Sequence, residues 1–352
     1  MSEWSRRSVA LVGCGRIADV HRQYLATVPQ AELIAVCDAD PQARRAMSAR
    51  AAVPAYASLD DLLRCAAPHV VHIVTPPPTH AALAMQALEG GAHVLVEKPM
   101  ALDGAAADAL VAAARRRSLI VTADHNRWFD PVVQRARQWL AADTLGELVG
   151  VDIFQSAAPD PNVKTQEWKD RLPGGALHDV APHPAYLLRH FAGPLDTVEV
   201  VSQRDEAGQV VEARVAARGR IACGTITLSM RARPAVNWVR LFGTVATAEI
   251  NLNHMTLVLY REHRVSKLIG KVLPNLDVAW QLLQETVRNG VEFVRGRQRF
   301  YPGMGAHLRA FYESITTGAP PPVSPEEARD VVALCEQIFA PSAAPRLRAV
   351  AT

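Results

Sequence analysis

The feature that most constrains the fold is a short apolar run followed at once by closely spaced glycines. Residues 8–12 have the composition of a buried strand, and Gly13-Cys14-Gly15-Arg16-Ile17-Ala18 follows directly, leading into a helical pattern. Gly13 would permit a tight turn, Gly15 would let the backbone approach a pyrophosphate, and Ala18 would allow helix and strand to pack closely. The pattern predicts a strand–turn–helix unit that binds a dinucleotide. The residues expected to bind it here are Gly13, Gly15, Arg16 and Ile17.

An acidic residue after the second apolar run indicates which dinucleotide binds. Residues 33–37 read as a strand that ends at Asp38, 23 positions beyond Gly15. A carboxylate at this place accepts hydrogen bonds from both hydroxyls of the adenosine ribose and repels a 2′-phosphate. Ala39 and Asp40 supply no cation. We therefore expect NAD, with NADP less favoured.

Strands and helices continue to alternate through the first 124 residues. Further strands are expected at 70–74, 94–96 and 119–122, so the fold class is α/β with a doubly wound parallel sheet. Ligands bind outside the carboxyl ends of such strands. The residues at these ends that are expected to face the cofactor are Glu97 and Lys98. Simpler interpretations stay open: His80 as a structural helix start, and Glu97 with Lys98 as a surface ion pair.

The second half has a different pattern. Six runs between residues 149 and 250 read as successive strands joined by short turns, which predicts an α+β domain with a mostly antiparallel open sheet. Residues 272–297 form a long amphipathic helical pattern, expected to pack on the sheet or a subunit, with a membrane-surface role as the alternative. The expected domains are a Rossmann domain over 1–124, a substrate-binding and oligomerisation domain over 125–340, and a loose tail over 341–352.

Composition excludes several classes of protein. At 352 residues, 49% hydrophobic and 21% charged, the chain has a soluble globular composition with a net charge of only +3, which gives no argument for nucleic acid. No apolar run is long enough to span a membrane, and no signal peptide is expected. The five cysteines lack metal-ligand spacing. We expect reduced thiols, no metal and a cytoplasmic location.

Several short motifs together carry a resemblance. Gly13-Cys14-Gly15, Asp38, Thr75-Pro76-Pro77-Pro78-Thr79-His80 and Glu97-Lys98-Pro99 stand in the order and spacing of the glucose–fructose oxidoreductase / inositol dehydrogenase / MocA family (Gfo/Idh/MocA). Residues 174–183 are similar to the Gly-Gly…Asp-x-x-x-His element of that family. The resemblance covers most of the chain and fades after about residue 250.

The resemblance implies roles for particular residues. Lys98 would position the substrate against the nicotinamide, His183 would be the general acid/base, and Asp179 would contact substrate hydroxyls. The loop that contains Thr75, Pro76 and His80 would pass beside the pyrophosphate and the nicotinamide ribose of the cofactor. The other residues expected on the substrate side are Arg127, Trp168 and Tyr186. Tyr186 stands where many relatives carry a second Asp. The resemblance also implies a homo-oligomer, a dimer or tetramer.

Two prolines depart from the family pattern. Pro182 and Pro184 flank His183, and interior prolines break helices. We therefore expect a helix to start at Pro184, with His183 as its cap.

The expected function is hydride transfer between NAD and a carbinol or ketone of a sugar, cyclitol or nucleotide-sugar. Two alternatives stay open. One is a hydrolase or lyase of the same fold that uses NAD only transiently, and the other is a non-catalytic nucleotide-binding subunit. Net release of NADH would separate the first alternative from a dehydrogenase.

Overall fold

A computed structural model of the chain describes residues 6–157, 167–170, 172–296 and 300–340. It divides into two compact units. The first contains Met1–Gln138 and Thr286–Ala333, and the second contains Trp139–Glu285 and Leu334–Thr352. The predicted loose tail over 341–352 lies outside the described residues.

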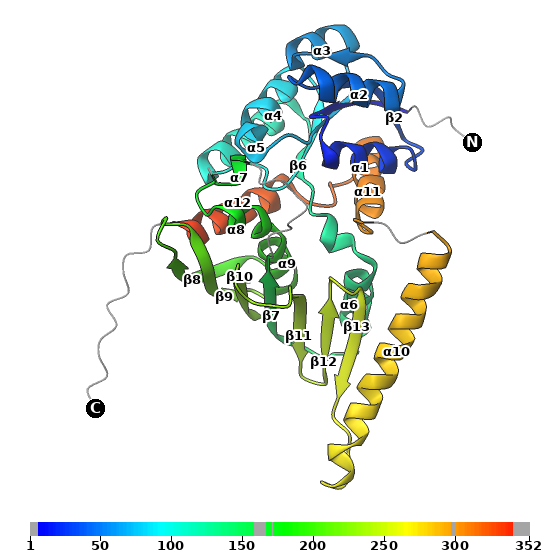
Figure 1. The fold of residues 1–352 in the computed structure, drawn as a ribbon, viewed down its shortest axis with the longest axis vertical. Coiled ribbons are helices and arrows are strands. Elements are labelled where there is room, and N and C mark those ends of the chain that lie inside the picture. Colours follow the sequence, from blue (N-terminus) through cyan, green and yellow to red (C-terminus); the bar gives the residue numbers. More distant parts are fainter. Residues whose placement is uncertain (1–5, 158–166, 171, 297–299, 341–352) are drawn as a thin grey trace. The chain divides into compact units, whose positions relative to one another are not determined.

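The first unit is built on a six-stranded parallel sheet in the order β3-β2-β1-β4-β5-β6 (Figure 1). Its strands are β1 (Arg7–Val12), β2 (Ala31–Cys37), β3 (Ala55–Tyr56), β4 (Val70–Ile73), β5 (His93–Val96) and β6 (Val121–Ala123). The predicted doubly wound sheet is therefore confirmed. The two-residue strand β3 was not predicted, because so short a run carries no periodicity.

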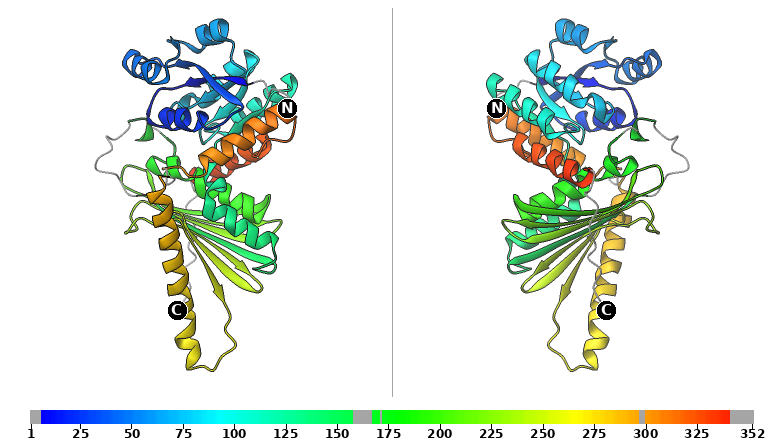
Figure 2. Two further views of the ribbon diagram at one scale, coloured as in Figure 1. Left: turned by 90° about the vertical axis from the view of Figure 1, so that its right-hand side faces the viewer. Right: turned by 90° about the vertical axis from the view of Figure 1, so that its left-hand side faces the viewer.

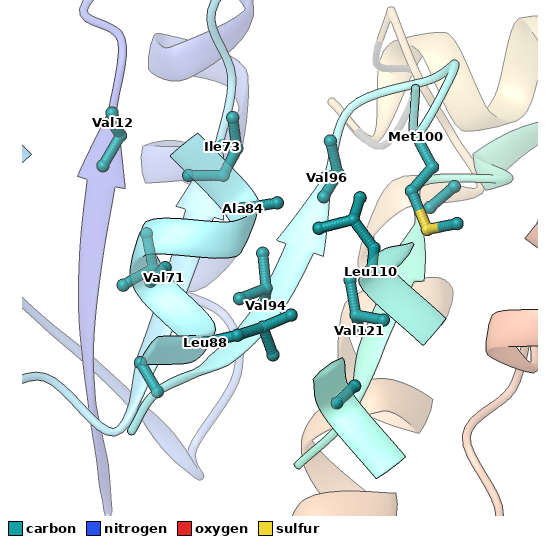
Figure 3. Packing of buried hydrophobic residues seen from close by; sticks show 14 of the residues in the cluster. Val12, Val71, Ile73, Ala84, Leu88, Val94, Val96, Met100, Leu110 and Val121 are labelled. Carbon is teal, nitrogen blue, oxygen red and sulfur yellow. The ribbon is translucent and has the colours of Figure 1, made fainter. Parts of the chain in front are cut away.

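Helices cover the sheet between its strands. They are α1 (Arg16–Leu25), α2 (Pro41–Ala51), α3 (Leu59–Ala66), α4 (His80–Glu89) and α5 (Gly104–Arg117), with short 3₁₀ turns η1 (Pro77–Thr79) and η2 (Asn126–Phe129). Three of them begin at side-chain caps, with Asp40, Ser58 and Asp103 each accepting a backbone N–H of the first turn. Figure 3 shows the apolar core between the sheet and α4 and α5, where Val71, Val94 and Val96 meet Leu88 and Leu110.

A helix from the far end of the chain completes this unit. Helix α11 (Met304–Thr317) lies against α1, and its Met304, Leu308 and Phe311 join the apolar cluster of β1 and α1. The start of α12 (Pro325–Phe339) is fixed by a capping box, since Ser324 and Glu327 exchange side-chain and backbone hydrogen bonds. Residues 286–333 thus group with the first unit, whereas the sequence interpretation assigned all of 125–340 to the second domain.

The second unit is built on a seven-stranded sheet in the order β13-β12-β11-β7-β10-β9-β8 (Figure 2). Its strands are β7 (Leu148–Ser156), β8 (Leu195–Arg204), β9 (Val210–Gly219), β10 (Cys223–Ser229), β11 (Asn237–Gly243), β12 (Ala246–Asn251) and β13 (Thr256–Arg261). Only β7 and β10 pair in parallel, so the predicted mostly antiparallel sheet is confirmed. Strand β13 was not predicted.

The remaining elements are helical. They are α6 (Pro131–Ala141), α7 (Glu167–Asp170), α8 (Ala176–Val180), α9 (Pro182–Ala192), η3 (Ile269–Lys271) and α10 (Leu273–Val294). Helix α9 covers one face of the sheet through β7, β9 and β10. Helix α10 follows the β13 edge, where Gln281 bonds both backbone groups of Leu259 and Glu285 accepts the N–H of Leu257. This packing covers an edge that would otherwise be open to pairing, and it favours the packed-helix interpretation of residues 272–297.

Membrane-spanning segments were searched among the described residues. None of their helices combines the length and hydrophobicity that a bilayer crossing requires.

Candidate active site

The glycine-rich turn between β1 and α1 has the geometry that a pyrophosphate needs. Gly13 has φ +102°, and a Cβ on it would lie 2.7 Å from the Val74 carbonyl oxygen, so only glycine fits. Gly15 precedes α1, and a Cβ there would meet nothing within 4 Å. Arg16 is the exposed first residue of α1, and Ile17 packs on the core beneath it. A helix N-terminus with unhindered backbone N–H groups is a ready site for phosphate oxygens.

Asp38 is held at the end of β2 next to this turn. Its Oδ2 accepts the N–H of Cys14 at 2.7 Å, and its Oδ1 accepts the N–H of Asp40 at 2.8 Å. A carboxylate tied to the glycine-rich turn suits the adenosine ribose. The sequence interpretation missed Arg44, whose guanidinium donates to the carbonyl of Asp38 at 2.6 Å. Arg44 lies on α2, six residues after Asp38, so the residues directly next to Asp38 in the sequence did not indicate this contact.

The loop after β4 is held by its own side chains. Thr79 donates its hydroxyl to the Thr75 hydroxyl at 2.7 Å, and Pro76 is exposed where η1 begins. The His80 ring is fully buried, with Nδ1 2.7 Å from the Pro99 carbonyl oxygen and Nε2 2.7 Å from the Thr75 carbonyl oxygen. His80 therefore joins this loop to the segment after β5. This supports the structural interpretation of His80, and its expected contact with the cofactor stays a prediction.

Glu97 and Lys98 follow β5 at the same carboxyl edge of the sheet, and Lys98 is half-buried. The Glu97 carboxylate is buried and lies 3.1 Å from Nε2 of His21 on α1. Its burial corrects the surface ion-pair interpretation of Glu97, and its expected contact with the cofactor stays a prediction. Burial raises the pKa of Glu97, and the hydrogen bond from His21 opposes that shift.

His21 belongs to a larger buried polar network that the sequence interpretation missed. Its Nε2 lies 3.7 Å from Oδ2 of Asp124 at the end of β6, and Oδ1 of Asp124 lies 2.7 Å from Nδ1 of His307 on α11. His21, Glu97 and Asp124 place their ligand atoms within 4.8 Å of one another, a spacing that a metal ion could also use. The one signal in the sequence is the place of His21 on the inner face of α1, three residues after Ala18.

Arg127 lies in η2, just before a buried carboxyl group. Asp130 accepts the N–H of Gly303 at 2.9 Å. Burial raises the pKa of Asp130 to about 7, although the charge of Arg127 and this hydrogen bond both oppose the shift. Arg127 is thus placed beside an acid.

The second unit brings together two of the predicted substrate-side residues, Asp179 and Trp168, through Lys169. Asp179 on α8 forms an ion pair with Lys169 on α7, at 2.9 Å between Oδ2 and Nζ. The same ammonium group lies 5.4 Å from the centre of the Trp168 ring. Lys169 was not among the expected site residues, and its place next to Trp168 in the sequence was the available signal.

His183 is the second residue of α9, which begins at Pro182 after Ala181. This corrects the predicted start at Pro184 and the cap role of His183. Prolines are tolerated throughout the first turn, because the N–H groups there have no partner within the helix. Asp179 and His183 lie on successive helices, with Ala181 between them still in helical conformation, at φ −58° and ψ −33°.

The His183 ring contacts Tyr186, another predicted site residue on the same helix. Nδ1 lies 2.9 Å from the hydroxyl of Tyr186, the two rings meet edge to face, and both side chains are buried. If Nδ1–H donates to the tyrosine oxygen, Nε2 carries the lone pair that a general base uses. If the tyrosine hydroxyl donates to Nδ1 instead, Nε2 carries the proton, so the direction of this hydrogen bond decides which ring nitrogen is free to act as a base.

The fold and the glycine turn with its ribose acid define a class, the dinucleotide-binding Rossmann proteins with a second α+β unit. Comparison with known families narrows this class. Residues 7–125 match "Oxidoreductase family, NAD-binding Rossmann fold", and residues 133–249 match "GFO/IDH/MocA C-terminal domain". The chain belongs to the Gfo/Idh/MocA oxidoreductase family.

Relatives in this family act on sugars and related alcohols. The chain is 36% identical over 128 residues to the UDP-N-acetylglucosamine 3-dehydrogenase of Acidithiobacillus ferrooxidans, which covers 36% of this chain and 40% of that protein. It is 23% identical to the myo-inositol 2-dehydrogenase of Thermotoga maritima over 91% of this chain and 92% of that one. The WlbA dehydrogenase of Bordetella pertussis, solved with NADH and UDP-GlcNAcA, has the same fold, with a TM-score of 0.77, 20% identity and 95% of each chain covered.

Proposed function

We propose that the chain is an NAD-dependent dehydrogenase that transfers hydride between a carbinol carbon of a sugar, cyclitol or nucleotide-sugar and the nicotinamide. The observation that carries this proposal is the shared carboxyl edge of β1, β2, β4 and β5. This edge presents the open glycine turn, the Asp38 carboxylate and Lys98. The named relatives, which act on sugar hydroxyl groups, support the substrate class.

NAD, when bound, is the hydride acceptor. Side chains of the protein take up the proton and stabilise the developing charge. Lys98 is proposed to stabilise negative charge on the substrate oxygen. His183 takes the hydroxyl proton at Nε2, because Nδ1 already lies against Tyr186. Asp179 and Lys169 form a charged pair, which offers both a hydrogen-bond acceptor and donors to substrate hydroxyls. Arg127 and Trp168 remain proposed substrate contacts.

NAD is proposed as the preferred cofactor because the Asp38 carboxylate repels a 2′-phosphate. All five cysteines are free, and burial raises the pKa of Cys14 to about 12 and of Cys37 to about 11, which keeps both thiols unreactive. Free thiols suit a reducing compartment, and we place the enzyme in the cytoplasm.

The experiment is a substrate panel assayed with NAD for net NADH formation. UDP-N-acetylglucosamine, a methyl glucoside and myo-inositol represent the three substrate classes. We expect at least one to reduce NAD with wild-type protein. Lys98→Ala should lower turnover roughly 10²-fold or more, by loss of charge stabilisation. Lys267→Ala, which removes an exposed lysine of the second unit, is the matched control and should leave turnover unchanged.

The proton step has its own variants within the same assay. His183→Ala should lower turnover by roughly 10²-fold or more, because it removes the general base. Tyr186→Phe should lower turnover less and alter the rise of rate with pH in the oxidation direction, because the ring loses the acceptor that fixes its tautomer. Normal turnover in Lys98→Ala or His183→Ala would show that the site is misplaced. Turnover of substrate without net NADH would instead favour transient oxidation.

A further inference from the structure

We propose that His21 and His80 are positioning residues that hold the segment Glu97–Pro99 from two sides, and thereby orient Lys98. This inference rests on the proposed function of Lys98. The two histidines come from different helices. His21 lies on α1, which follows the glycine turn, and His80 starts α4, which follows the Thr75 loop.

The contact of His21 has a defined direction. Its Nε2 faces the carboxylates of Glu97 and Asp124, which accept hydrogen bonds when ionised, so Nε2 carries a proton and donates. Its Nδ1 lies 3.0 Å from Nδ1 of His72, and Nε2 of His72 lies 2.8 Å from the hydroxyl of Tyr312. With neutral rings, Tyr312 donates to His72, His72 donates to His21, and His21 donates to Glu97.

This order of donors agrees with the surroundings of each group. His72 and Tyr312 are fully buried, and burial lowers the pKa of His72 and raises that of Tyr312, so both stay neutral. Helix α11 supplies Tyr312 at one end of the chain of donors, and through His307 it also holds Asp124. These buried hydrogen bonds join α1, β4 and α11, although Nε2 of His307 has no hydrogen-bond partner among the described residues.

His80 holds the other side of the segment. Both ring nitrogens lie 2.7 Å from carbonyl oxygens, of Thr75 and of Pro99, and carbonyl oxygens only accept. The two short contacts favour a proton on each nitrogen, whereas burial and the charge of Lys98 oppose that form and lower the pKa of His80. A neutral ring has one N–H and donates to one of the two carbonyl oxygens, whereas a protonated ring donates to both and bridges the Thr75 loop and Pro99.

These contacts leave little freedom to the main chain around Lys98. The Glu97 N–H donates to the Ile73 carbonyl at 2.8 Å, the Glu97 side chain binds His21, and the Pro99 carbonyl binds His80. Lys98 lies between these anchors. Because a shift of about 1 Å in a catalytic group can cost roughly 10²-fold in rate, releasing either anchor should slow turnover without any loss of chemistry-bearing atoms.

The first test needs no substrate. The chain has five lysines, Lys98, Lys164, Lys169, Lys267 and Lys271. Reductive methylation with ¹³C gives a small set of NMR signals, and Lys98→Arg identifies the signal of Lys98. We expect that signal to move toward the signal of exposed Lys267 and to broaden in His21→Leu and in His80→Ala. An unchanged Lys98 signal in both variants would overturn the proposal.

The matched control is His93→Asn. His93 accepts the Ile120 N–H at 3.0 Å at the opposite end of β5, so it tests the loss of a histidine hydrogen bond in the same strand. Circular dichroism and thermal unfolding of all variants show which of them fold. If His93→Asn displaces the Lys98 signal as much as His21→Leu does, the effect is general loosening of the strand and the positioning role is wrong.

The second test uses a substrate found in the panel. His21→Leu should lower kcat by roughly 10-fold or more with the Kd of NAD nearly unchanged, and His21→Gln, which keeps a donor toward Glu97, should recover most of the rate. Equal kcat in His21→Leu and wild type would overturn the proposal, while full activity of Lys98→Ala would instead overturn the proposed function. A stoichiometric metal ion that copurifies and is lost in His21→Leu would replace the hydrogen-bond account with a metal site.

Discussion

Asp38 and Arg44 present opposite charges where the adenosine ribose is expected to bind. The carboxylate is tied to the Cys14 N–H, and the guanidinium is tied to the Asp38 carbonyl. The carboxylate disfavours a 2′-phosphate, whereas Arg44 would favour one if the carboxylate were absent. The balance between NAD and NADP therefore depends on both residues.

Asp38→Gly should shift the ratio of dissociation constants toward NADP by roughly 10-fold or more, because the repulsion is removed and the cation stays. Titration of wild type and variant with both cofactors measures the ratio. The double variant Asp38→Gly with Arg44→Ala is the control and should lose most of the gain. A ratio unaffected by Asp38→Gly would contradict the assignment of the ribose acid.

Two buried aspartates of the first unit should respond to pH in opposite ways. The pKa of Asp130 is raised from 3.8 to about 7 by burial, so its contribution to stability is largest below 3.8 and is lost as the pH rises through 7. Burial alone would also raise the pKa of Asp124, but bonding to His307 lowers it from 3.8 to about 2. Its contribution is present above 3.8 and is lost as the pH falls through 2.

Asp130→Asn should therefore raise the free energy of unfolding in mildly alkaline buffer, by a few kcal/mol at most, because it removes a charge that burial disfavours. Asp124→Asn should lower it by about 3 kcal/mol, since His307 loses its partner. Urea denaturation of the two variants and of wild type measures the sign of each change in the free energy of unfolding. Destabilisation by Asp130→Asn in alkaline buffer would show that this carboxylate is stabilised when ionised.

At the level of residues, the sequence predicts groups whose neighbours lie close along the chain. Gly13, Gly15 and Asp38 follow from a strand–turn–helix pattern, and the structure gives them the expected geometry. His21 and His307 could not be predicted in the same way. Both lie close to Asp124, although His21 and His307 are 286 residues apart in the sequence and belong to different helices. The buried state of Glu97 depends on this assembly.

At the level of elements, most helices and strands follow from periodicity, and the misses have local causes. Helix α9 begins at Pro182 because two prolines fit into a first turn, where no N–H partner is required. Strand β3 has two residues and is visible only through its pairing with β2. The helical pattern of residues 304–317 agrees with α11, but such a pattern does not identify the surface on which a helix packs, so its contact with α1 could not be predicted.

Helix α10 carries apolar side chains that the described part of the chain leaves exposed. Leu276, Trp280, Leu283 and Val287 are 53–60% exposed. The face of the seven-stranded sheet opposite α9 also exposes Val201 and Phe242. We propose that a second copy of the chain covers these surfaces, because large exposed apolar patches mark association sites.

Trp280→Glu should therefore lower the stability of the oligomer, with a shift of mass toward the monomer at dilute concentration. Light scattering after size exclusion measures the mass. Arg288→Glu is the control on the same helix. It changes charge without removing apolar area and should have little effect. A wild-type protein that is monomeric at all concentrations would contradict the proposed self-association.

At the level of the whole molecule, the sequence predicts two domains and their order along the chain. The residue boundaries of the two units depend on how the late helices α11 and α12 pack. Residues 286–333 return to the first unit because the apolar faces of α11 and the start of α12 pack on the Rossmann core. This return is why a helix beyond both matched family segments supplies His307 and Tyr312 to the network beneath Lys98. No pattern within 1–124 contains that information.

The central claim is that hydride passes from a carbinol carbon of the substrate to the nicotinamide. The most direct measurement uses a panel substrate that carries deuterium on that carbon, with mass spectrometry of the cofactor after turnover. The account predicts deuterated NADH formed in equal amount to the ketone product. A turned-over substrate with no deuterium in the released cofactor would contradict it.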